Sequence, residues 1–162
     1  MTQSVRRIAI GELYAAAAPA RLISLALGSC VAIVLHDSRA AVGGMAHVLL
    51  PTPSSGKAEA GPGRAVTTAV PALIKAVTEL GADPDHLTAK LIGGARMFAN
   101  LAVPGLIPMG QRNLTATRAE LQQLGIPIVA EACGEDYGRN VDYDVATGMV
   151  RVTSFAHDAE LI

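Results

Sequence analysis

The stretch LGSCVAIVLHDSRAAVGGMAHVLLP, residues 27–51, decides how this chain folds. It holds two apolar runs of strand length, residues 30–36 and 41–50, with a short polar segment between them. Asp37–Ser38 favours a turn, and Gly43–Gly44 indicates a bulge or the close approach of another segment. The stretch therefore predicts an antiparallel hairpin.

The predicted hairpin brings a thiol close to an imidazole. If its turn is centred between Ser38 and Arg39, Cys30 and His47 lie directly opposite, with Cβ atoms about 4.5–5.5 Å apart. A thiol beside an imidazole is the minimum arrangement for a cysteine nucleophile with its own general base. The alternative is structural, because a lone cysteine in an apolar run is usually a small buried side chain.

Around the hairpin, the hydrophobic pattern predicts further strands and two clear helices. The expected strands are residues 5–10, 21–27, 88–92, 126–132, 140–145 and 149–155. The expected helices are residues 64–80, where Pro71 requires either a kink or a start near Thr68, and residues 114–124, with Asn113 as the N-terminal cap. These elements predict an α+β fold with mostly antiparallel sheets and two or three packed helices.

Length and composition place the chain in a broad class and exclude others. The 162 residues predict one domain over residues 1–162, with a mobile Pro/Gly/Ser-rich loop at 51–63. The chain has 13 Lys+Arg against 14 Asp+Glu, and 3% aromatic residues, so we expect no nucleic-acid partner. No apolar run reaches the roughly 20 residues of a membrane span, so we expect no membrane insertion and a cytoplasmic location.

The other cysteine and histidine residues form no recognisable site. His36 lies six residues from Cys30, about 20 Å along a strand, so it is a poor partner for the thiol. Cys133 is expected to be structural, and a redox pair with Cys30 lacks CxxC spacing. The spacing predicts no metal site and no cofactor. A base also needs an orienting group, and the sequence alone does not choose between Ser24 and Ser29.

Several segments together resemble one protein family. They are LGSC followed by GGMAH in residues 27–47, KLIGGARMF (90–98), GQRNLTATRAELQQLGIPIVAE (110–131) and the GRNV…TG-x-V tail (138–150). These segments resemble CheD, the family of chemoreceptor glutamine deamidases. The resemblance runs from Gly11 to about Val152.

The resemblance implies an activity and a set of site residues. CheD proteins hydrolyse selected glutamine side chains of chemoreceptors to glutamate, releasing ammonia through a cysteine thioester. The catalytic Cys and His of the family fall on Cys30 and His47, and its third residue, usually Thr, falls on Ser24. Serine keeps the hydroxyl but lacks the methyl group that restricts χ1. Backbone N–H groups around Gly28 and Ser29 are the expected oxyanion donors.

The resemblance also implies a fold and partners. The fold would be an α/β sandwich similar to cysteine-dependent deamidating toxins. The expected partners are the cytoplasmic domains of chemoreceptors and the CheC phosphatase. The alternative function is a non-catalytic adaptor that binds chemoreceptors or CheC, and Ser24 in place of Thr is the one feature that favours it.

Overall fold

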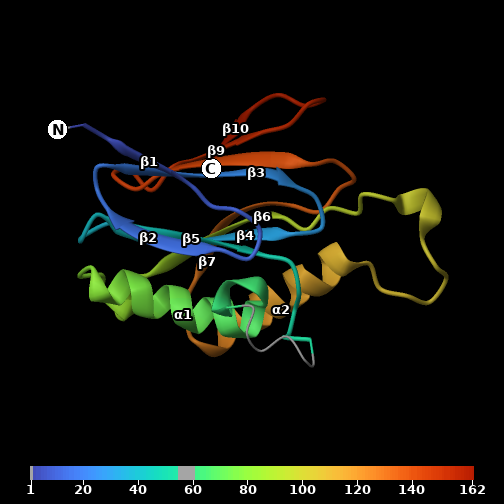
Figure 1. Cartoon of the computed structure of the whole chain (residues 1–162), viewed down its shortest axis with the longest axis horizontal. Helices are drawn as coiled ribbons and strands as arrows, with labels where there is room; N and C mark the ends of the chain where they lie inside the picture. Colours follow the sequence, from blue (N-terminus) through green and yellow to red (C-terminus); the bar gives the residue numbers. More distant parts are fainter. Residues whose placement is uncertain (1, 55–60) are drawn as a thin grey trace.

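The computed structural model describes residues 2–54 and 61–162, and these form three layers. Two β-sheets stack face to face, and two helices cover the outer face of the second sheet (Figure 1). Within the described residues the first sheet has the strand order β1 (Ser4–Arg7), β3 (Ala20–Leu27), β8 (Arg139–Asp144), β9 (Val150–Thr153), β10 (Glu160–Leu161). The second has the order β2 (Leu13–Ala17), β5 (Val42–Val48), β4 (Val31–Asp37), β6 (Thr88–Gly93), β7 (Ile128–Cys133).

The predicted fold class is confirmed. Among the described residues the structure has two α-helices, and most strand pairings are antiparallel; only β1–β3 and β6–β7 pair in parallel. Both sheets are therefore mixed, with antiparallel pairing dominant. The similarity to deamidating toxins stays a prediction.

Strand β4 is central, and its side chains divide between two cores. Val31, Ile33 and Leu35 face the helices, whereas Ala32 and Val34 face the first sheet. All these side chains are at most 1% exposed. A strand covered on both faces needs apolar residues at every position, which explains why this segment reads as a continuous apolar run.

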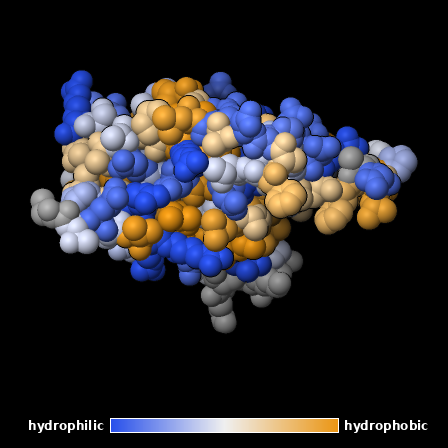
Figure 2. Space-filling model, turned by 90° about the horizontal axis from the view of Figure 1, so that it is seen from above, coloured by the Kyte–Doolittle hydropathy of each residue, from blue (hydrophilic) through white to orange (hydrophobic). Residues whose placement is uncertain are grey.

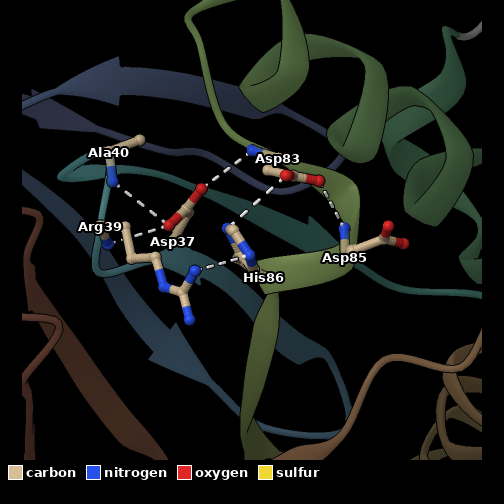
Figure 3. Close-up of polar contacts among 6 residues, drawn as sticks. All are labelled: Asp37, Arg39, Ala40, Asp83, Asp85 and His86. Carbon is tan, nitrogen blue, oxygen red and sulfur yellow. Dashed lines mark hydrogen bonds and ion pairs between the residues drawn. The ribbon is translucent and has the colours of Figure 1, made fainter.

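The hairpin of β4 and β5 forms as predicted, but its turn lies one residue later. Asp37 pairs with Val42, and His47 pairs with Ala32 rather than with Cys30. The carboxylate of Asp37 fixes this turn by accepting the N–H groups of two turn residues and of Asp83, 2.8 Å away (Figure 3). The last of these contacts is tertiary, so turn chemistry alone does not set the register.

The two helices begin at different residues from those predicted. Helix α1 (Val66–Glu79) contains Pro71, and it starts two residues before Thr68. Helix α2 (Met109–Gln123) starts well before residue 114, so the prediction of Asn113 as a cap was wrong. Asn113 lies inside α2, and its side chain is fully buried. Its amide donates to carbonyl groups of other segments of the chain instead of capping the helix.

The loop prediction for residues 51–63 is only partly covered. Residues 55–60 lie outside the described residues, and 62–64 form the 3₁₀ helix η1 (Pro62–Arg64). In the described part of the chain, no helix combines the length and apolar character needed to cross a membrane.

Residues 96–108, between β6 and α2, project from the body of the molecule (Figure 1). We call this segment, which includes the 3₁₀ helix η3 (Ala99–Leu101), the apolar arm. Apolar side chains gather along one edge of the projection (Figure 2). The exposed ones are Met97, Phe98, Leu101, Val103, Leu106 and Ile107.

Candidate active site

The predicted site residues come from both sheets. The chain leaves the first sheet at the end of β3 and enters the second at β4, and Gly28–Cys30 makes this crossing. Ser24 lies on β3 and His47 on β5, and both are essentially fully buried. Neighbouring residues of the same parity, Leu22 and Met45, belong to the core between the sheets. Ser24 and His47 therefore face each other across the sandwich.

The hydroxyl of Ser24 fixes the protonation pattern of His47. Ser24 Oγ lies 2.7 Å from the carbonyl oxygen of Ile8 and 2.8 Å from His47 Nδ1. A carbonyl oxygen only accepts, so the single hydroxyl proton goes to Ile8. Ser24 Oγ must then accept from His47, which places the ring proton on Nδ1. In the neutral ring, Nε2 consequently carries the free lone pair.

The free nitrogen of His47 is suited to act as a base. His47 Nε2 is buried and has no hydrogen-bond partner among the described residues. Burial lowers the pKa of His47, with a smaller opposing contribution from the Ile8 carbonyl. The ring is therefore neutral near pH 7, with an unoccupied acceptor site.

Cys30 lies diagonally across from His47. Because His47 pairs with Ala32, Cys30 is two residues from that pair on the same side of the chain. Diagonal neighbours have Cβ atoms about 7–8 Å apart or somewhat less, so the predicted direct opposition of Cys30 and His47 was wrong. Burial raises the pKa of the half-buried thiol, and its own backbone N–H partly offsets this. The resting pair is therefore a neutral thiol and a neutral imidazole.

Three successive carbonyl groups anchor the segment that carries the thiol. Gly28 O accepts from Ala95 N at 2.9 Å, and Cys30 O accepts from Gly94 N at 2.8 Å. Between them, Ser29 O accepts from Asn113 Nδ2 at 3.0 Å. The segment is thus held from one side by the β6–arm connection and by α2.

Gly93 allows this close approach. A Cβ atom at Gly93 would lie 2.3 Å from Cys30 O, and the residue has φ of +109°. Only glycine fits both conditions without strain. The glycine pair 93–94 therefore marks tight packing against Cys30 rather than a nucleotide site.

The backbone N–H groups of Ser29 and Cys30 are candidate hydrogen-bond donors to a substrate. Neither donates to an acceptor on another residue within residues 2–54 and 61–162. The Cys30 N–H lies close enough to its own sulfur to lower the pKa of the thiol. A free donor beside a nucleophile matches the requirement for stabilising an oxyanion.

The second cysteine has a different environment. Cys133 Sγ donates to Leu91 O at 3.2 Å, and burial raises its pKa to about 12. Cys133 pairs with Gly93, which pairs with Val31, so two strand spacings, about 10 Å, separate it from β4. A disulfide needs Cα atoms less than about 7 Å apart. The geometry therefore disfavours a Cys30–Cys133 redox pair, and both cysteines are free.

Sequence reasoning missed two groups that contact the site. The Ile8 carbonyl holds Ser24, and no sequence signal identifies it because every residue carries a carbonyl. Asn113 was expected to cap a helix, although its amide reaches Ser29 O and Leu49 O. The one available signal was its position within the GQRN segment that resembles the family.

Comparison with known proteins agrees with the resemblance. The family model described as CheD chemotactic sensory transduction matches residues 49–154. A protein of Desulforamulus reducens named "Probable chemoreceptor glutamine deamidase CheD" is 37% identical over 96% of this chain and 94% of its own. Proteins of Methanococcus maripaludis and Geobacter sulfurreducens with names of the same kind are 41% and 39% identical, over 91% and 90% of this chain and 94% and 90% of their own. This chain belongs to the CheD family.

Proposed function

We propose that this chain is a glutamine deamidase that acts on chemoreceptors, with Cys30 as nucleophile and His47 as general base and acid. One observation carries the proposal: His47 has its Nδ1 proton held by Ser24 and its Nε2 free and buried. The names of the relatives support the substrate class. The substrates would be the cytoplasmic domains of the receptors, which makes the cytoplasm the expected place of action.

The first half of the reaction forms a thioester. His47 Nε2 takes the proton of the Cys30 thiol as sulfur attacks the carbon of the glutamine carboxamide. The backbone N–H of Cys30, together with that of Ser29, donates to the oxygen on which negative charge develops. When the tetrahedral intermediate collapses, the C–N bond breaks and the proton on Nε2 passes to the nitrogen, which leaves as ammonia.

The second half hydrolyses the thioester. His47 Nε2 accepts a proton from water as the water oxygen attacks the acyl carbon. The C–S bond then breaks, and the proton returns to sulfur, so the products are glutamate and the regenerated thiol. These reaction steps need a neutral imidazole at rest, which fits the lowered pKa of His47. It also accommodates a resting thiol, whose pKa is raised by burial.

The apolar arm is the surface we propose for receptor contact. A groove of about 290 Å³ runs along the arm, and one of its lining residues is Ser29, the neighbour of Cys30. A receptor segment that fills this groove would thus lie next to the nucleophile. Leu101, 76% exposed, should contribute to KM, so Leu101→Ser is expected to raise KM and leave kcat unchanged. CheC is a further candidate partner, and competition between CheC and receptor fragments would test whether both use the arm.

The test of the proposed activity compares the two cysteines. Receptor cytoplasmic fragments are incubated with the wild-type chain, Cys30→Ala or Cys133→Ala, and glutamine-to-glutamate conversion is followed by peptide mass spectrometry. The proposal predicts that Cys30→Ala abolishes conversion and that Cys133→Ala retains it. Receptor binding without conversion by the wild-type chain would instead favour the adaptor alternative.

A further inference from the structure

One buried amide, that of Asn113, connects the two backbone segments that carry the nucleophile and the base. Its Nδ2 donates to Ser29 O at 3.0 Å and to Leu49 O at 3.2 Å. Both partners are carbonyl oxygens, so the nitrogen end of the amide must face them. Ser29 directly precedes Cys30, and Leu49 lies two residues after His47.

The bond to Ser29 fixes the direction of the N–H group of the nucleophile. In a trans peptide the C=O of one residue and the N–H of the next point in opposite directions. Holding Ser29 C=O toward α2 therefore turns the Cys30 N–H away from α2. This N–H lies close to Cys30 Sγ and donates to no other residue in the described parts of the chain.

The same bond strengthens the donor. A hydrogen bond accepted by a carbonyl polarises its peptide, so the N–H at the other end becomes a better donor. Neighbouring contacts of Gly28 O and Cys30 O fix the flanking peptides, but Asn113 holds the peptide whose N–H belongs to Cys30.

We infer that Asn113 is a positioning residue for the deamidation reaction: it holds the Ser29–Cys30 peptide so that the Cys30 N–H meets the developing oxyanion. The inference rests on the proposed function. Asn113 acts through the peptide and does not itself contact the substrate.

The bonds that Asn113 donates explain why asparagine stands at this buried helix position. Asn113 is 0% exposed, and its Oδ1 is buried with no partner among the described residues. An unsatisfied buried acceptor destabilises the folded state. An apolar side chain would avoid that cost but would leave Ser29 O and Leu49 O without this donor, so the two donated bonds are the feature that distinguishes asparagine here.

Two reactions of Cys30 separate positioning of the oxyanion donor from general damage to the site. Deamidation passes through an oxyanion, whereas alkylation of the thiol by iodoacetamide displaces iodide from carbon and forms none. Asn113→Ala should lower kcat for receptor fragments about 10- to 100-fold. This is no more than the loss expected when a direct oxyanion donor is removed. KM and the alkylation rate of Cys30, measured by peptide mapping, should each stay within about threefold of wild type.

Thr117→Val is the matched control. Thr117 lies one turn further along α2, is also 0% exposed, and donates its hydroxyl to Asn113 O. This variant should lower the melting temperature without lowering kcat. If Asn113→Ala does not fold, Asn113→Gln, which keeps both donors on a longer side chain, should give an intermediate kcat with an unchanged alkylation rate.

Each outcome decides the inference separately from the proposed function. A wild-type chain without deamidase activity would refute the proposed function. An active wild type with an equally active, folded Asn113 variant would overturn only the role of Asn113. A parallel fall of kcat and alkylation rate would also overturn it, because it would show a general disturbance of the site.

Discussion

Replacing Ser24 by alanine removes the group that fixes the ring of His47. The hydroxyl donates to Ile8 O and accepts from His47 Nδ1, at 2.7 and 2.8 Å. Without it, a buried carbonyl and a buried ring N–H both lose their partner. The ring can then place its proton on Nε2, which is the nitrogen that accepts the thiol proton in the proposed mechanism.

The size of the stability effect follows from these two bonds. A hydrogen bond contributes about 0.5–1.5 kcal/mol, so Ser24→Ala should lower the free energy of unfolding by about 2 kcal/mol. For a chain of this length, about 1 kcal/mol corresponds to roughly 2–4 °C, which predicts a fall of about 4–8 °C in Tm. Loss of the correct tautomer should lower kcat more strongly, by about 100-fold or more, since a wrong histidine tautomer in a serine protease costs about 10⁴.

Kinetics of receptor deamidation and thermal melts of the same preparations provide the assay. Ser24→Thr is the matched variant, because threonine keeps the hydroxyl and fits the residue usual in the family. We expect Ser24→Thr to retain kcat and Ser24→Ala to lose it, with KM similar in both. A Ser24→Ala variant with the Tm loss but full kcat would refute the positioning of His47 by Ser24.

Three further results are expected. Burial lowers the pKa of His47, so the acid limb of the pH profile of kcat/KM should lie below the ordinary imidazole value of about 6.5. The free energy of unfolding should fall as the pH decreases through that value. An acid limb above about 6.5 would contradict a neutral base. Gly93→Ala, whose Cβ would meet Cys30 O, should lower both Tm and kcat, whereas Gly134→Ala, with a similar positive φ but open space, should lower only Tm. Asp37→Asn weakens the charge-assisted bonds from three backbone N–H groups and should cost about 1–3 kcal/mol in chemical denaturation, with kcat retained.

The fold was largely predictable because its signals are local. The apolar run at 30–36 and the turn residues that follow it predict the hairpin without reference to the rest of the chain. Its register was not predictable to the residue. Asp37 closes the turn partly through the N–H of Asp83, which lies far along the sequence, so local turn chemistry placed the centre one residue too early.

The geometry of the candidate site was predictable to the extent that the hairpin carries it. Cys30 and His47 lie on adjoining segments, so strand pairing alone brought them near each other. Choosing Ser24 over Ser29 needed the resemblance, because the contact with His47 crosses between two sheets. Asn113 was misread as a cap because its acceptors, Ser29 and Leu49, lie 84 and 64 residues away in the sequence.

The central claim is that Cys30 forms a thioester with the substrate glutamine, and hydroxylamine tests it directly. Hydroxylamine attacks a thioester, so it would convert the bound acyl group to a hydroxamate on the receptor and free the thiol. Mass spectrometry of receptor fragments treated with the wild-type chain should show hydroxamate replacing glutamate at the target glutamines, in proportion to the hydroxylamine present. Cys30→Ala should form neither product. Undiminished ammonia release with glutamate as the only product would contradict a thioester at Cys30.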